Sequence, residues 1–169
     1  MADVFVKTCF AFYCSAAEWA LLQEAFLLSF DLCAGVEPNP PGPGFMALFP
    51  PDDEDRWSGF RDLFSDRDYP DFGADLAGGP EDGSANWRAI ISAEVSLEPL
   101  AIAALIQRCC AAALAGGPIG FAWSTSCSRQ VIDAFGGGWC AVFSDHVALE
   151  TTGAALAKAI APSAASGSI

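Results

Sequence analysis

The stretch Val4–Leu22, VFVKTCFAFYCSAAEWALL, decides the fold class, because a strand pattern changes to a helix pattern within a few residues. Its first ten residues are rich in aromatic and β-branched side chains, which favour a strand. Ser15 and Glu18 have the spacing of a capping box and predict the start of a helix. Apolar residues continue at helical spacing at Trp19, Leu22, Phe26 and Phe30. The stretch therefore predicts a strand followed by a helix with a broad apolar face.

The rest of the chain repeats this alternation. Further strands are predicted at 45–49, 87–94, 119–125 and 139–149, and further helices at 56–64, 99–114 and 154–160. Two helices packed on one face of a mostly antiparallel sheet explain this order most economically. The sequence thus predicts an α+β two-layer sandwich. We expect one domain over residues 1–161, with an acidic insertion at about 50–86, and a flexible tail at 162–169.

Composition limits the classes of partner. The chain has 169 residues, of which 53% are hydrophobic, so it is long enough for one domain with a core. Its net charge of -13 argues against direct binding to a nucleic-acid backbone, because phosphate contacts require Lys or Arg. Cationic surfaces are the expected partners. A mean hydropathy of +0.34 also permits a homodimer that covers exposed apolar surface.

Cysteine usage predicts a reducing compartment. Seven cysteines are an odd number, and no signal peptide precedes them. Five of them have apolar neighbours and are predicted to be reduced and buried: Cys9, Cys33, Cys109, Cys110 and Cys140. No apolar run reaches the roughly 20 residues that a membrane span needs. We therefore expect a soluble, cytoplasmic protein without membrane contact.

The segment 52–82 carries much of the negative charge. It contains eleven acidic and three basic residues, a net charge of -8, together with interleaved aromatic residues that indicate an ordered segment. A fixed array of carboxylates can compete with a nucleic acid for a basic groove. An ordinary solvated acidic surface is the alternative. The candidate protein-binding residues are Asp52, Asp53, Glu54, Asp55, Asp62, Asp66, Asp68 and Asp71, with Asp75 further along.

The stretch Trp123–Trp139, WSTSCSRQVIDAFGGGW, suggests a second kind of site. Cys127 could act as a nucleophile if the single histidine, His146, lies within hydrogen-bond reach as its base. The three glycines 136–138 could cradle an anion through backbone N–H groups. However, they open a strand, and no phosphate-loop pattern is present. The alternative is scaffold: two paired strands joined by a polar loop. We expect a protein that is not an enzyme, and keep a Cys127–His146 enzyme as the alternative.

No metal or cofactor is predicted. One histidine and no Cys-x-x-Cys pair do not make a zinc site, and Cys9 and Cys14 fall on opposite faces of a strand. The run of acids at 52–55 could hold calcium loosely, but the EF-hand pattern is absent. A glycosidase needs two carboxylates across a cleft. Nothing in the spacing of the acids selects such a pair.

A resemblance rests on Phe121-Ala122-Trp123, Cys127-Ser128 and Phe135-Gly136-Gly137-Gly138. With these residues, the chain resembles a family of small uncharacterised proteins of phages, plasmids and bacterial mobile elements. The resemblance covers Trp87 to about Val147. The chain departs from it at Arg129-Gln130-Val131, where basic and proline residues are expected, and has a longer segment at 38–86. The resemblance implies no activity. It implies a mobile-element setting in a bacterial host, where accessory proteins antagonise defence complexes such as CRISPR effectors.

Overall fold

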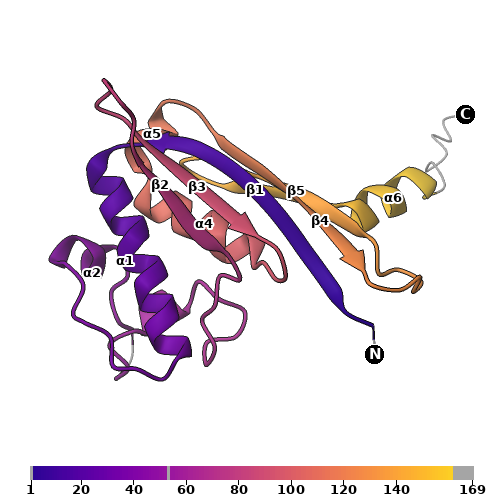
Figure 1. Cartoon of the computed structure of the whole chain (residues 1–169), viewed down its shortest axis with the longest axis horizontal. Helices are drawn as coiled ribbons and strands as arrows, with labels where there is room; N and C mark the ends of the chain where they lie inside the picture. The colour runs from indigo at the N-terminus through magenta and orange to yellow at the C-terminus, as the bar shows by residue number, and fades with distance from the viewer. Residues whose placement is uncertain (1, 53, 162–169) are drawn as a thin grey trace, which may run out of the picture.

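A computed structural model describes residues 2–52 and 54–161. These residues form one β-sheet with helices packed on one side (Figure 1). In this part of the chain the sheet has six strands in the order β2-β3-β1-β4-β5-β6, and every neighbouring pair is antiparallel. The strands are β1 (Val4–Cys14), β2 (Asp75–Pro80), β3 (Trp87–Ala93), β4 (Ile119–Cys127), β5 (Gly136–Val142) and β6 (Val147–Thr151). The predicted α+β class is confirmed.

β1 lies in the middle of the sheet and alternates between its two faces. Phe12 and Cys14 are buried under the helices, whereas Cys9 and Tyr13 are exposed on the opposite face, which no helix covers in Figure 1. This alternation follows from the two-residue period of a strand. The prediction that Cys9 is buried is therefore wrong. Cys33 is only half-buried, whereas Cys109, Cys110 and Cys140 are buried as predicted.

The two main helices are α1 (Ala16–Cys33) and α4 (Pro99–Cys109), which contact each other on the covered face of the sheet. The predicted capping box is present: the Ser15 hydroxyl accepts from the Glu18 N–H, and the Glu18 carboxylate accepts from the Ser15 N–H. The predicted helix at 99–114 is interrupted at Cys110, which has φ -116° and ψ 44°. A short separate helix, α5 (Ala111–Ala115), follows.

Glu18 explains where α5 starts. Its side chain is buried, and its Oε1 accepts hydrogen bonds from the Ala112 and Ala113 N–H groups at 2.7 and 3.0 Å. Its Oε2 accepts from the N–H and hydroxyl of Ser15. One carboxylate thus satisfies otherwise unpaired N–H groups at the starts of two helices. Burial by itself raises the pKa of Glu18, but these hydrogen bonds outweigh it and lower the pKa.

The acidic insertion is built on a cluster of aromatic rings. The predicted strand at 45–49 is instead a helix, α2 (Pro43–Leu48). Pro43 at its first turn favours a helix, and the four-residue spacing brings the buried Phe45 and Phe49 rings to 4.7 Å between centroids. The predicted helix near 56–64 is confirmed as the short α3 (Ser58–Arg61) with adjoining turns. The buried aromatic members of this cluster are Phe45, Phe49, Trp57, Phe60, Phe64 and Phe72.

Two strands differ from their predictions. β2 falls within the insertion, in a Gly-Gly-Pro sequence of low strand propensity, and pairs with β3 from Asp75↔Ser92 to Pro80↔Trp87. The single strand predicted at 139–149 is two strands, β5 and β6. A turn separates them, in which the Phe143 N–H donates to the His146 carbonyl at 2.9 Å. Ser144 and Asp145 occupy its centre, as turn-forming residues do.

The last helix, α6 (Thr152–Ile160), starts two residues before its predicted beginning and has no buried residue. It projects from the end of the sheet, beside the start of β5 and the end of β6 (Figure 1). The predicted tail at 162–169 lies outside the described residues. Within residues 2–52 and 54–161, no helix combines the length and apolar character needed to cross a membrane.

Candidate functional site

The acidic segment is folded locally by its own carboxylates. Asp55 Oδ1 accepts from the Trp57 N–H at 2.9 Å, and Asp66 Oδ1 accepts from the Asp68 and Tyr69 N–H groups. Such short-range bonds are the usual way in which aspartate stabilises a turn. Several candidate acids therefore have a structural role besides their charge. Asp53 lies outside the described residues.

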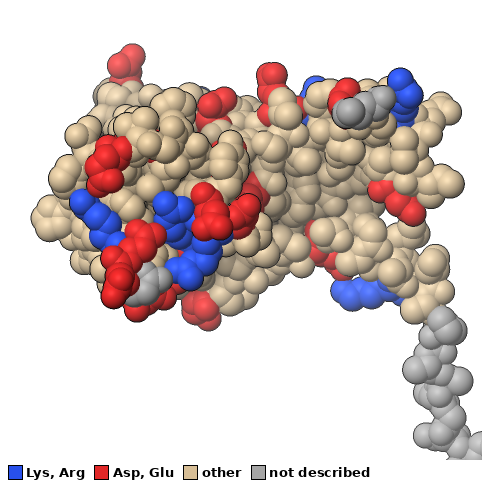
Figure 2. Space-filling view, turned by 90° about the horizontal axis from the view of Figure 1, so that it is seen from below, with Lys and Arg blue, Asp and Glu red and all other residues tan. Residues whose placement is uncertain are grey.

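Arginines lie among these acids, as Figure 2 shows on one face of the molecule. Arg61 Nε lies 2.9 Å from Asp55 Oδ2, and Arg67 Nε lies 3.0 Å from Asp62 Oδ1. Asp52 lies 3.9 Å from Arg67, and its pKa is lowered mainly by hydrogen bonding with the Ser58 side chain. The structure thus brings Asp52, Asp55 and Asp62 together with arginines on a surface of mixed charge, whereas Asp71 lies at a cavity beside α1.

Cys127 and His146 are not brought together. Cys127 is the last residue of β4, whereas His146 precedes β6 beyond the Val142 end of β5, which pairs with Ile119. Eight residues separate Ile119 from Cys127, a span of roughly 26 Å in an extended strand. The Cys127–His146 pair of the alternative hypothesis is therefore not formed, because β5 runs antiparallel to β4 and carries the chain away from Cys127 before His146 is reached.

His146 has local partners instead. Its Nδ1 lies 2.8 Å from Asp145 Oδ1, and its ring stacks on Phe143 with 4.3 Å between centroids. Hydrogen bonding to His146 is also the main cause that lowers the pKa of Asp145. These contacts stay within one exposed turn. They give the histidine a role in the turn and no nucleophile to activate.

We expect alkylation to distinguish the seven thiols by exposure and charge state. Burial raises the pKa of Cys14 and Cys140 to about 11 and that of Cys109 to about 12, so these thiols should not react at neutral pH. Exposed Cys9 should react first with iodoacetamide in the folded protein, and peptide mass mapping over time measures the order. Faster labelling of Cys127 than of Cys9 would contradict this order and revive an activated thiolate.

Two of the three glycines, Gly137 and Gly138, permit close strand pairing. A Cβ on Gly137, which has φ +148°, would lie 2.1 Å from the Trp123 carbonyl oxygen on β4. A Cβ on Gly138 would lie 2.5 Å from the Trp123 ring and 2.8 Å from the Glu150 carbonyl oxygen. Glycine is required because both neighbouring strands approach closely. β4 and β5 therefore pair on either side of the polar loop, as the scaffold interpretation of Trp123–Trp139 predicts.

Replacing Gly137 with alanine should therefore lower the free energy of unfolding by about 2 kcal/mol, through backbone strain and the contact with Trp123. Urea denaturation followed by tryptophan fluorescence measures the change. Gly136 provides the control, because its added Cβ would meet only the Thr152 Cβ at an ordinary 3.8 Å. Equal stability of the two variants would show that the close approach is unimportant.

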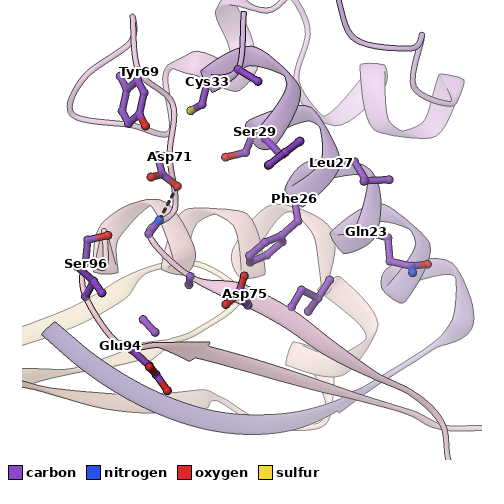
Figure 3. A pocket seen from close by; sticks show the side chains of 17 residues that line it. Gln23, Phe26, Leu27, Ser29, Cys33, Tyr69, Asp71, Asp75, Glu94 and Ser96 are labelled. Carbon is purple, nitrogen blue, oxygen red and sulfur yellow. Dashed lines mark hydrogen bonds between the residues drawn. The ribbon is translucent and has the colours of Figure 1, made fainter. Parts of the chain in front are cut away.

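A cavity of about 900 Å³ was not predicted from the sequence. It lies between the second half of α1, residues 69–76 and residues 93–96 (Figure 3). Its inner wall includes Phe26, whose ring lies 4.8 Å from the buried Phe72 ring, and Ser29, whose hydroxyl donates to the Pro70 carbonyl at 2.6 Å. The apolar spacing along α1 was visible in the sequence, but the other walls come from segments whose positions it did not reveal.

Among the described residues, no three His, Cys, Asp or Glu side chains form a group that could hold a metal ion. Comparison with protein-family models, curated proteins and solved structures finds no match to the chain.

Proposed function

We propose that this chain is a non-enzymatic binding protein of a mobile element. In this proposal it inhibits a nucleic-acid-handling defence complex of a bacterial host, such as a CRISPR effector, in the host cytoplasm. It would cover a basic surface of that complex with the acidic residues of its segment 52–82. The observation that carries the proposal is that these carboxylates are held on an ordered, buried aromatic cluster.

Order matters for binding because a fixed array loses little conformational freedom when it meets its partner. The buried Phe60 ring lies within 6.1 Å, between centroids, of four other rings. The Ser65 N–H also donates to Glu98 Oε1 at 2.6 Å, which joins the acidic segment to the start of α4. The acids therefore project from the folded core and not from a loose linker.

The distribution of charge supports a protein partner over a nucleic acid. Glu54, Asp66 and Asp68 are exposed beside the ion pairs of Arg61 and Arg67. A phosphate backbone would be repelled by the net charge of -13. A basic protein surface would be attracted, and the arginines could at the same time pair with isolated acids on that surface.

Charge reversal tests the proposal. The variant Glu54→Lys with Asp68→Lys should lose about tenfold or more of its inhibition of DNA binding by guide-loaded CRISPR effectors, measured by gel-shift titration. Inhibition by the unaltered protein should also weaken as salt is raised. The control is Asp3→Lys with Asp145→Lys, which changes net charge equally on other parts of the molecule. Equal inhibition by both variants, or no inhibition of any effector, would reject the proposal.

A further inference from the structure

The cavity beside α1 has an apolar rim that the fold leaves uncovered. α1 buries Trp19, Leu22, Ala25 and Leu28, as a helix packed on a sheet should. A helix that is apolar on its other sides as well is normally buried there too. On α1, however, Leu27 and Phe30 remain 64% and 71% exposed, and both line the cavity.

The other walls continue this rim. Tyr69 and Val95 line the same cavity from different segments and are 55% and 63% exposed. Exposed apolar residues are normally scattered singly over a protein surface. Here four large apolar side chains surround one cavity. An exposed apolar concentration of this kind on a protein surface marks a binding site.

The charged side chains that line the cavity are all acidic. Asp71, Asp75 and Glu94 line it, and no Lys, Arg or His is among its lining residues. Asp71 Oδ1 accepts from the Gly73 N–H at 2.9 Å, which fixes the carboxylate in its turn (Figure 3). Burial is the main cause that raises the pKa of the Cys33 thiol on the facing wall. The negative charge of Asp71 raises this pKa further, against an opposing effect of Arg61. The occupant should therefore combine apolar groups with a cation.

The strand at the cavity favours a peptide over a small molecule. In the described sheet β2 is at the edge and pairs only with β3. Its first residues, Asp75 and Leu76, form part of the cavity wall facing α1. An edge strand presents unpaired backbone N–H and C=O groups, to which an extended segment can add as a further strand.

We propose that the groove between α1 and β2 binds an extended segment of a partner protein in which a Lys or Arg stands beside aliphatic or aromatic residues. The apolar side chains contact Leu27, Phe30 and Val95, and the cation faces Asp71 and Asp75. An aromatic face at Tyr69 or Phe30 adds cation–π attraction. This inference rests on the proposed function in one respect, namely that the partner is basic.

A random 12-residue peptide library displayed on phage provides the probe. Selection on the unaltered protein should enrich sequences with a Lys or Arg next to apolar residues. The most enriched peptide is then synthesised, and its affinity is measured by fluorescence anisotropy. Phe30→Asp and Asp75→Asn should each weaken binding about tenfold. The matched controls are Ile132→Asp, at a position far from the groove in sequence that is 89% exposed, and Asp3→Asn, and both should bind normally.

The outcomes separate this inference from the proposed function. Failure to enrich any sequence, enrichment of sequences without a cation, or equal binding by the Phe30→Asp variant would overturn the inference. The Glu54→Lys and Asp68→Lys variant should keep peptide binding even where it loses inhibition of an effector. If that variant instead loses the peptide while Phe30→Asp retains it, the peptide binds around Glu54 and Asp68, outside the groove. The groove is then excluded and the proposed function stands.

Discussion

Replacing Glu18 with alanine is expected to lower the free energy of unfolding by about 3 kcal/mol, the largest effect of any single polar substitution that we predict. The carboxylate accepts four hydrogen bonds, two from Ser15 and two from the N–H groups of Ala112 and Ala113. Its removal leaves N–H groups at two helix starts without their acceptor. Urea denaturation followed by circular dichroism measures the loss.

The pH dependence gives a second test of the same carboxylate. Because the folded-state pKa of Glu18 is lowered from its usual 4.5, ionised Glu18 stabilises the fold above pH 4.5. That contribution should disappear as pH falls below 4.5 and passes through the lower folded-state pKa. The stability difference between the unaltered protein and Glu18→Gln should shrink over the same range. Glu24→Gln is the control on the same helix, since Glu24 accepts one long bond, from the Gly42 N–H at 3.4 Å.

Replacing Phe60 with alanine is expected to cost about 4 kcal/mol of stability, within the usual range for removal of a buried phenylalanine. Phe60 is 1% exposed and contacts the rings of Phe45, Phe49, Phe64 and Phe72. The cavity left behind would loosen the whole cluster that supports the acidic segment. Urea denaturation gives the total loss, and amide hydrogen exchange shows whether protection falls first at residues 45–72.

Two variants make this prediction specific. Phe60→Leu keeps most of the buried volume and should cost less than about 1.5 kcal/mol. Tyr69→Ala removes an aromatic ring of the same segment that is 55% exposed, and should change stability little. If Phe60→Ala were no more damaging than Tyr69→Ala, the insertion would not depend on its aromatic cluster.

Local sequence patterns correctly predicted the helices and strands that are determined by interactions between residues close together in the sequence. The Ser15 and Glu18 capping box placed the start of α1 correctly, and aromatic and β-branched runs located β1, β3 and β4. β2 was not predicted, because its Gly-Gly-Pro sequence has low strand propensity and becomes a strand only through pairing with β3. α2 was mistaken for a strand because a five-residue apolar run has no clear period. The helix is stabilised by the buried contact between Phe45 and Phe49, which only the structure reveals.

The site was predictable only in part. The acidic segment and its interleaved aromatic residues were visible as composition. The pairing of Asp55 with Arg61 and of Asp62 with Arg67 depends on the path of the turns, which composition does not reveal. The cavity was hidden for a similar reason. Its walls come from three segments spread over more than seventy residues, and no single stretch carries its pattern.

The central position of β1 has a consequence for the order of events during synthesis. β1 pairs with β3 through Thr8↔Ala93 and with β4 through Val4↔Cys127, so both of its neighbours follow much later in the chain. β2–β3 and β4–β5–β6, by contrast, are hairpins that close over short distances. Closing long loops costs entropy before contacts repay it, which slows folding.

On a ribosome, β1 must therefore wait with both edges unpaired until β3 has been made, and with one edge unpaired until β4 follows. An unpaired strand rich in aromatic residues is prone to associate with other chains during that time. α1, which follows β1 directly and has its own capping box, can form early and shield one face of the waiting strand. The open face, with Cys9 and Tyr13, has no such cover. The need for chaperones during expression should therefore last until β4 has emerged and paired with β1.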